Sequence, residues 1–210
     1  MIVRTLDDLS QNILKTVVET LAAGGVISFP TETVYALSCD ATKELAIDKI
    51  YEIKNRNREQ VFAILVSNIN ELEKYAEVDE RFYKLAALFS PGPITYVLQA
   101  KSKASICSRL IKDGKIGIRI PDHKLAQEIL KHYGHPIAAT SVNLSGHPSA
   151  LQVSDIDDEL QKQIDLILDG GKCTLGVGST VVDLSSKDKI SILREGSIPE
   201  KLIRSLLSDR

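Results

Sequence analysis

The stretch VISFPTETVYALSCDAT, residues 26–42, is the segment from which the fold of this chain is most readily predicted. It opens with VISF, a short run rich in residues that favour β-strands, and we expect residues 30–42 to form a loop. Apolar residues recur at helical spacing before it, over residues 10–23, and after it, over residues 43–54. A helix, a strand, a loop and a second helix in this order are typical of layered domains that combine helices with a sheet.

The same alternation of helix and strand patterns continues to the end of the chain. Further strands are predicted over residues 62–66, 94–99, 116–120, 136–140, 164–168, 179–184 and 190–195. Further helices are predicted over residues 69–76, 79–89, 123–132 and 155–163, with a last one near Pro199. The final strands lack long helices between them, so antiparallel pairs should occur beside parallel ones. We therefore expect the α/β (α+β) class, with a twisted mixed parallel and antiparallel sheet and flanking helices in a single domain over residues 1–210.

Composition and charge narrow the classes of function. The 210 residues are 43% apolar and carry a formal net charge of −2, so any nucleic-acid contact would need a local basic patch. Cys39, Cys107 and Cys173 lie far apart, and His132 and His135 fit a solvated helix end, so no metal site is predicted. No apolar run is long enough to cross a membrane and the N-terminus lacks a signal-peptide pattern, so a cytoplasmic protein without a membrane partner is expected.

Several common catalytic motifs are missing from the sequence. GGKCT, residues 170–174, resembles part of a phosphate-binding loop, but Cys173 stands where a hydroxyl should bind magnesium. The chain offers instead segments rich in hydroxyl, amide and cationic side chains near the ends of predicted strands, among them PTET, KNR, TSVNLSG, VGST and LREG. Such side chains suit the binding of an anionic substrate, as nucleotidyl transfer requires, although the same residues are common in ordinary turns.

Taken in order, these segments form a pattern that is specific to one family. The pattern consists of FPTETVYALSCDAT (29–42), KNR (54–56), PGPIT (91–95), IRIPDH (118–123), TSVNLSG (140–146), GSTVVD (178–183) and LREG (193–196). In order and rough spacing it resembles the YrdC-like threonylcarbamoyl-AMP synthases, over about residues 10–205. The resemblance implies a YrdC-like fold, a twisted mixed sheet with helices around a concave cavity. It also suggests the short, single-domain form of that family.

The resemblance implies an enzyme, a nucleotidyltransferase. Such a synthase joins L-threonine, bicarbonate and ATP into threonylcarbamoyl-AMP and pyrophosphate, with Mg²⁺ expected to accompany the ATP. A downstream threonylcarbamoyl-transferase complex then modifies adenosine 37 of tRNA at N6, and family members are described as binding double-stranded RNA.

The family's hallmark, a Lys-x-Arg with a Ser-x-Asn, falls on Lys54, Arg56, Ser141 and Asn143. The resemblance implies that the two cations offset the negative charge around the α-phosphate. Ser141 and Asn143 are two residues apart, so in an extended loop they project to the same side and can hold phosphate or ribose oxygens. Without the resemblance, Lys54 and Arg56 would be interpreted as a solvated helix end.

Other site residues follow from the same resemblance. The ATP site is implied at Arg56, Gln60, Lys115, Ser141, Ser149 and Arg194. The L-threonine site is implied at Thr33, Arg119, Ala139 and Ser179. Arg119 would pair with the α-carboxylate of threonine, because a guanidinium matches a carboxylate with two parallel hydrogen bonds. Residues 170–178, rich in glycine, are the candidate for a lid over the substrates.

Some positions depart from the family's usual pattern, and some alternatives stay open. Ala36, Asn57, Val61 and Leu65 stand where glycine, proline, proline and histidine are common. One alternative is an RNA-binding module like YciO, which lacks synthase activity and the Lys-x-Arg and Ser-x-Asn pairs. A second is the carbamoyl-phosphate module of hydrogenase-maturation proteins, whose zinc-binding cysteine pairs this chain does not have. A third is a solute-binding domain without turnover.

Overall fold

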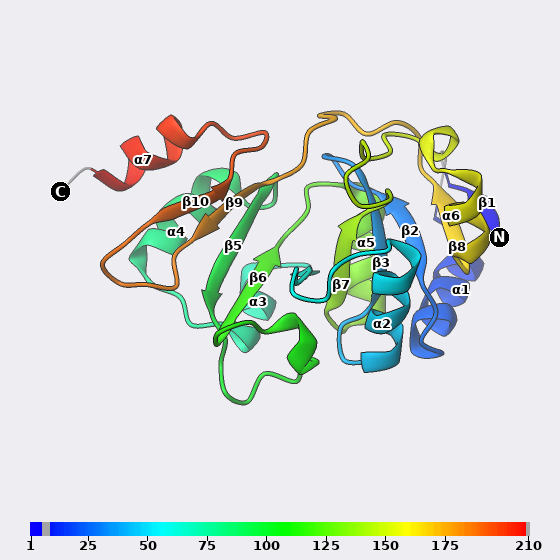
Figure 1. Cartoon of the computed structure of the whole chain (residues 1–210), viewed down its shortest axis with the longest axis horizontal. Coiled ribbons are helices and arrows are strands. Elements are labelled where there is room, and N and C mark those ends of the chain that lie inside the picture. The colour runs from blue at the N-terminus through cyan, green and yellow to red at the C-terminus, as the bar shows by residue number, and fades with distance from the viewer. Residues whose placement is uncertain (6–8, 209–210) are drawn as a thin grey trace.

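The computed structural model describes residues 1–5 and 9–208, and it contains one ten-stranded sheet with helices packed on both faces (Figure 1). The strands are β1 Ile2–Arg4, β2 Ile27–Pro30, β3 Tyr35–Asp40, β4 Ala63–Leu65, β5 Ile94–Gln99, β6 Lys115–Arg119, β7 Ile137–Ser141, β8 Leu166–Asp169, β9 Thr180–Asp183 and β10 Ser191–Arg194. They lie in the order β1-β8-β2-β3-β7-β4-β6-β5-β9-β10. Parallel pairs such as β4 with β6 occur beside antiparallel pairs such as β3 with β7, which confirms the predicted mixed sheet.

The helices begin and end near the predicted positions. They are α1 Gln11–Ala22, α2 Glu44–Ile53, α3 Ile69–Tyr75, α4 Glu80–Phe89, α5 Lys124–Tyr133, α6 Asp158–Gln163 and α7 Glu200–Ser208. Short 3-10 turns occur at Ser108–Leu110 and Val153–Asp155. Polar residues fix several starts, for example Asn68, whose side chain accepts a hydrogen bond from the backbone N–H of Glu71. In the described residues no helix is both long and apolar enough to cross a membrane.

Two predicted boundaries were wrong. Residues 30–42, predicted as a loop, contain β3, a strand at the centre of the sheet. Every residue of β3 is buried, so its sequence shows no alternation of apolar and polar residues. The helix predicted over residues 155–163 starts only at Asp158, because the Asp157 carboxylate accepts the first backbone N–H groups of α6.

Consecutive residues along the central strands face opposite sides of the sheet. Leu37 of β3 belongs to the larger apolar core, which includes residues of α2, α3, α4, α6 and α7. Ala36 belongs to a second core formed with α1 and α5 on the opposite face. The second core ends at Leu65 of β4, so strands β6, β5 and β9 have no helix of this core over them. Because the helices on this face stop at β4, there is room for a cavity over the strands beyond it.

Candidate active site

A cavity of about 500 Å³ opens on the α1 and α5 face of the sheet, beside these helices. Its floor consists of alternate residues from the central strands, as the two-residue period of a strand requires. These floor residues are Ala36 of β3, Ala63 and Leu65 of β4, Thr95 and Val97 of β5, Gly117 and Arg119 of β6, Ala139 and Ser141 of β7, and Val181 and Asp183 of β9. The loops at Thr33, Arg56 to Phe62, Ser149 and Gly178 to Ser179 supply further lining residues.

The hollow exists because the middle of the floor has very small side chains. Ala63 of β4 stands beside Gly117 of β6 on one side and Ala139 of β7 on the other. Ala36, where the family commonly has glycine, adds one methyl group to the same floor. Val61 and Leu65, two further departures from the family pattern, also line the cavity, whereas Asn57 does not.

Lys54 ends α2 and is almost fully buried, with 2% of its surface exposed. Its ammonium donates to the main-chain oxygens of Ser141 and Asn143 and to Oδ1 of Asn143, the last two at 2.7 and 2.8 Å. An ammonium has three protons, so all of its donors are used within the protein. Lys54 therefore holds the loop after β7 in place, and it is not among the residues that line the cavity.

The environment of Lys54 acts on its proton in two directions. Burial, with a further contribution from the charge of Arg56, lowers the pKa of Lys54 to about 7. The surrounding acceptor oxygens favour the charged form.

The second hallmark pair, Ser141 and Asn143, is also hydrogen-bonded within the protein. The Ser141 hydroxyl donates to Asn143 Oδ1 at 2.6 Å, and the Asn143 amide donates to the main-chain oxygens of Leu144 and His147. The hallmark residues thus lie together, as the predicted pairing requires. Lys54 and Asn143, however, use their hydrogen bonds to hold the loop after β7 rather than to reach the cavity.

Arg56 and Arg194 supply positive charge to the cavity. Arg56 donates to Thr140 Oγ1 at 3.0 Å and lies 5.1 Å from the ring centre of Phe62. Its Nε is buried and has no hydrogen-bond partner among the described residues. Burial lowers the pKa of the Arg56 guanidinium, and the charge of Arg194 adds to this effect. Because the two positive charges repel, an anionic ligand bound between Arg56 and Arg194 would be favoured.

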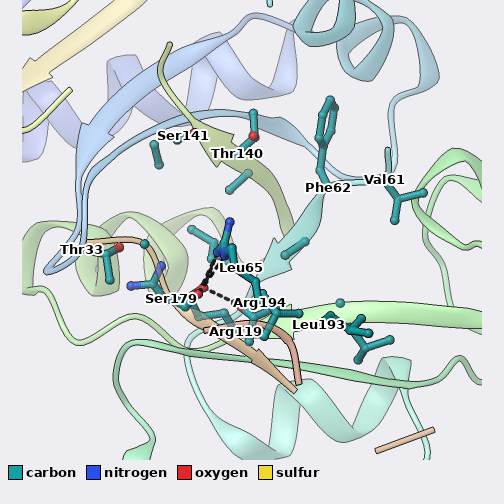
Figure 2. A pocket seen from close by; sticks show the side chains of 18 of the residues that line it. Thr33, Val61, Phe62, Leu65, Arg119, Thr140, Ser141, Ser179, Leu193 and Arg194 are labelled. Atoms are coloured by element: carbon teal, nitrogen blue, oxygen red, sulfur yellow. Dashed lines mark hydrogen bonds between the residues drawn. The ribbon is translucent and has the colours of Figure 1, made fainter. Parts of the chain in front are cut away.

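Ser179 holds the guanidinium of Arg194 in place. Its Nε and Nη2 donate to the Ser179 main-chain oxygen at 3.1 and 2.8 Å, and Nη2 also lies 3.2 Å from the Ser179 hydroxyl (Figure 2). In the part of the chain that the structure describes, neither Arg56 nor Arg194 forms an ion pair with a carboxylate, whereas Arg119 does. Among the arginines that line the cavity, Arg56 and Arg194 therefore carry the positive charge that no carboxylate of the described residues offsets.

One end of the cavity is lined by polar side chains. Arg119 lies there with Thr33 and Ser179, whose hydroxyls hydrogen-bond to those of Thr31 at 2.8 Å and Thr95 at 2.7 Å (Figure 2). Arg119 Nε donates to the main-chain oxygen of Gly92 at 3.2 Å. Hydroxyls and a guanidinium around the short side chain of Ala139 suit a small polar ligand that carries a carboxylate.

The other end of the cavity is mainly apolar. Its lining includes Val61, Phe62, Val97, Val181 and Leu193. Figure 2 shows Val61, Phe62 and Leu193 on the side of the cavity away from Thr33. Lys115 lies at this end, where its ammonium is 3.1 Å from the carboxylate of Asp183, so its charge is neutralised. Apolar side chains with a charged pair at the edge suit a flat heterocycle.

The structure places the predicted site residues unevenly. All of them line the cavity except Lys54, Asn143 and Gln60. Gln60 is exposed in the loop after Arg56, where its N–H donates to the main-chain oxygen of Asn57 at 3.1 Å. Sequence reasoning missed Thr95, Thr140, Phe62 and Asp183. Their strands were predicted, and the two-residue period identifies Asp183 as soon as Ser179 is known to face the cavity, whereas Thr95 follows from Arg119 only through the pairing of β5 with β6.

The predicted lid, residues 170–178, is tied to the cavity wall. The N–H of Cys173 donates to the main-chain oxygen of Leu151 at 2.8 Å. The N–H groups of Leu175 and Gly176 donate to the main-chain oxygens of Glu32 and Thr33 at 2.9 and 3.0 Å. These bonds tie residues 173–176 to the segment that carries Thr33, and none of residues 170–177 lines the cavity itself.

Comparison with known proteins connects this cavity to a family. The Sua5_yciO_yrdC family model, described as telomere recombination, matches residues 19–196. A relative from Methanocaldococcus jannaschii is 37% identical over 195 residues, which are 92% of this chain and 91% of that relative. The threonylcarbamoyl-AMP synthase of Pyrococcus abyssi is 35% identical over 189 residues, 89% of this chain. These cover 54% of the P. abyssi protein, so the chain spans about half of that relative's length.

Two solved structures are similar over nearly the whole chain. The crystal structure of P. abyssi Sua5 complexed with L-threonine is 30% identical, with a TM-score of 0.93, and covers 100% of this chain and 61% of that one. The crystal structure of Escherichia coli YciO is 30% identical, with a TM-score of 0.83, and covers 93% of this chain and 95% of that one. These similarities confirm the predicted YrdC-like fold around a cavity.

Proposed function

The chain belongs to the Sua5/YciO/YrdC family, and from that premise we propose that it is an L-threonylcarbamoyladenylate synthase, a nucleotidyltransferase. It would form threonylcarbamoyl-AMP and pyrophosphate from L-threonine, bicarbonate and ATP. The observation that carries this proposal is the cavity itself, in which two arginines without a carboxylate partner among the described residues lie between a polar end and an apolar end. Such a cavity suits a triphosphate placed next to an amino acid.

The polar end would bind L-threonine. Arg119 would take the α-carboxylate, with Thr33 and Ser179 offering hydroxyls to the polar groups and Ala139 leaving space beside them. The related P. abyssi Sua5 was crystallised as a complex with L-threonine, which supports an amino-acid site in this fold.

The middle and the apolar end would bind ATP. Arg56 and Arg194 would contact the phosphates, with the hydroxyls of Ser141 and Ser149 nearby. The adenine ring would lie among Val61, Phe62 and Leu193, near Lys115. Gln60 would reach ATP only from the exposed loop that carries it.

Magnesium would enter with the nucleotide. In the described part of the chain no three His, Cys, Asp or Glu residues form a metal-binding group. We therefore propose that Mg²⁺ is bound by phosphate oxygens and water as part of the substrate, and that the protein contributes only its cations.

The proposed reaction proceeds in two steps. The neutral amine of threonine adds to carbon dioxide and releases a proton, or condenses with bicarbonate and releases water, to give an N-carboxylate. An oxygen of that carboxylate attacks the α-phosphorus of ATP, and the bond to pyrophosphate breaks. Arg56 and Arg194 offset the charge on the phosphates, and the cavity holds the two reactants in contact, which is the larger source of rate. Lys54 contributes by fixing the loop that carries Ser141.

The product would leave for a further enzyme. We propose that a downstream threonylcarbamoyl-transferase complex uses threonylcarbamoyl-AMP to modify adenosine 37 of tRNA at N6, in the cytoplasm. Direct contact with tRNA or double-stranded RNA belongs to the alternative function, a YciO-like RNA-binding module. The similarity to E. coli YciO over most of both chains supports this alternative.

The proposal is tested by mass spectrometry of the reaction mixture. The purified protein with ATP, L-threonine, bicarbonate and Mg²⁺ should give threonylcarbamoyl-AMP and equimolar pyrophosphate. Omission of threonine or bicarbonate should abolish both products. ATP turnover that is indifferent to threonine and bicarbonate would refute the proposal, and salt-sensitive RNA binding without any product would favour the YciO-like alternative.

The small floor of the cavity gives a second prediction. A Cβ at Gly117 would lie 3.5 Å from the Ala63 Cβ and 3.6 Å from the Thr95 Cγ2, which are ordinary contacts. Gly117→Val should therefore fold, but its side chain should occupy the space between the two substrates and raise both KM values at least about 10-fold. As a control, Ile118→Val removes one methyl group on the opposite face, so it should cost about 1 kcal/mol of stability and leave both KM values unchanged. Normal substrate binding by Gly117→Val would contradict the assignment of the floor.

A further inference from the structure

A buried carboxylate lies behind the arginine of the polar end. Glu32 Oε1 is 2.7 Å from Arg119 Nη2, and both side chains are only 9% exposed. Thr31 and Thr33, on either side of Glu32 in the chain, line the cavity, but Glu32 does not. Neither Glu32 oxygen nor Arg119 Nη2 forms a directed hydrogen bond with the described residues, so their contact is an ion pair in which the charge of Arg119 compensates that of Glu32.

We propose that Glu32 is a positioning residue, which fixes the guanidinium of Arg119 so that its remaining N–H groups face a carboxylate in the cavity. This inference rests on the proposed function. Arg119 has five N–H donors, of which Nε is occupied by Gly92 and Nη2 lies against Glu32. The two contacts hold two different parts of the planar group and thereby set its orientation. The donors left over belong to a side chain that lines the cavity.

The contact between Glu32 and Arg119 also makes the polar end of the cavity less positively charged than the middle. Glu32 neutralises Arg119, so the polar end carries little net charge before a ligand arrives. Arg56 and Arg194 have no such partner among the described residues. A triphosphate is therefore attracted to the middle of the cavity, and the polar end is left for a ligand with a single carboxylate. Glu32 would thus keep ATP out of the amino-acid site.

Glu32 is also anchored from outside the cavity. Its main-chain oxygen accepts from the Leu175 N–H at 2.9 Å and from the Thr174 hydroxyl at 3.2 Å. A carboxylate whose own backbone is fixed can hold its partner with less loss of entropy on binding. The effect on the substrate would be on its affinity, since Glu32 touches no reacting atom.

The test compares Glu32→Gln with wild type in threonylcarbamoyl-AMP formation. The variant keeps the shape but loses the charge, and the threonine KM should rise at least about 10-fold while kcat and the ATP KM stay within about 3-fold. Glu32→Asp, which keeps the charge, should recover part of the threonine affinity. Glu71→Gln is the matched control, because this carboxylate accepts from the N–H and hydroxyl of Ser67 away from the cavity and should leave all constants unchanged.

A double-mutant cycle separates positioning from a general loss of structure. If Glu32 acts through Arg119, then the double variant should lower kcat/KM for threonine by the same factor as Arg119→Gln alone, within about 3-fold, because Glu32→Gln adds no loss once Arg119 is gone. The double variant buries no unpaired charge, so it should fold even if a single variant does not. An unchanged threonine KM in folded Glu32→Gln, an equal rise of both KM values, or additive losses in the double variant would overturn the inference. A wild-type protein that makes no product would refute the proposed function instead.

Discussion

Arg56→Gln is expected to lower kcat/KM for threonylcarbamoyl-AMP formation about 100- to 1,000-fold, with little change in the melting temperature. Arg56 lines the cavity, its charge is not neutralised by a carboxylate among the described residues, and its Nε has no hydrogen-bond partner there. Thr140 and Phe62 hold the guanidinium in place before ATP arrives. Its positive charge is therefore in position to offset the negative charge of the ATP phosphates. Initial rates of product formation at varied ATP and threonine give the measurement.

Arg58→Gln is the matched control for this experiment. Arg58 lies two residues further along the same loop, is 52% exposed and pairs with Asp48 at 2.9 Å. An exposed ion pair contributes little to stability, so this variant should keep the wild-type melting temperature and turn over within about 2-fold of wild type. Equal losses in the two variants would show that the loop, rather than the Arg56 charge in the cavity, controls the rate.

Lys54→Met should lose stability and activity together. The substitution leaves two main-chain oxygens and Asn143 Oδ1 without their ammonium donor at a site that is 2% exposed. With about 1 kcal/mol or more lost for each acceptor, the free energy of unfolding should fall by about 3 kcal/mol, and the melting temperature by about 6 to 12 °C. Because the loop carries Ser141 into the cavity, product formation should fall at least about 100-fold even below the melting temperature.

Two further variants define what Lys54 does. Lys54→Arg should not restore activity, because the larger planar guanidinium does not fit a fully buried site with three converging oxygens. Lys49→Met, at an exposed lysine of the same helix, should behave like wild type. If Lys54→Met melts at the wild-type temperature and loses only turnover, then Lys54 acts on the substrate directly and the structural role assigned to it is wrong.

The fold could be predicted from the sequence wherever patterns are local. The helices show apolar residues at helical spacing, and strands such as β6 are short apolar runs between turn residues. β3 was missed because a strand that is buried on both faces has no alternation to recognise. The order of strands in the sheet, in which β7 lies between β3 and β4, depends on contacts between distant segments that no local pattern shows.

The site could be predicted as a set of residues, but not as a set of contacts. The resemblance to a family brought Lys54 and Arg56 together with Ser141 and Asn143, and the structure places them side by side. The resemblance gave Lys54 a role on phosphate, whereas its donors are all used within the protein. The neutralisation of Lys115 by Asp183 depends on the register of β6, β5 and β9, and is visible only in three dimensions.

The central claim is that one cavity holds a triphosphate next to an amino acid. The most direct measurement is a crystal structure of this protein with L-threonine and a non-hydrolysable ATP analogue, from which the distance between the threonine nitrogen and the α-phosphorus is read. We predict about 5 Å, with room for one carboxylate group whose oxygen lies about 3 Å from phosphorus, the threonine carboxylate at Arg119 and the phosphates at Arg56 and Arg194. An analogue bound outside the cavity, or the two ligands competing for the same end of it, would contradict this claim.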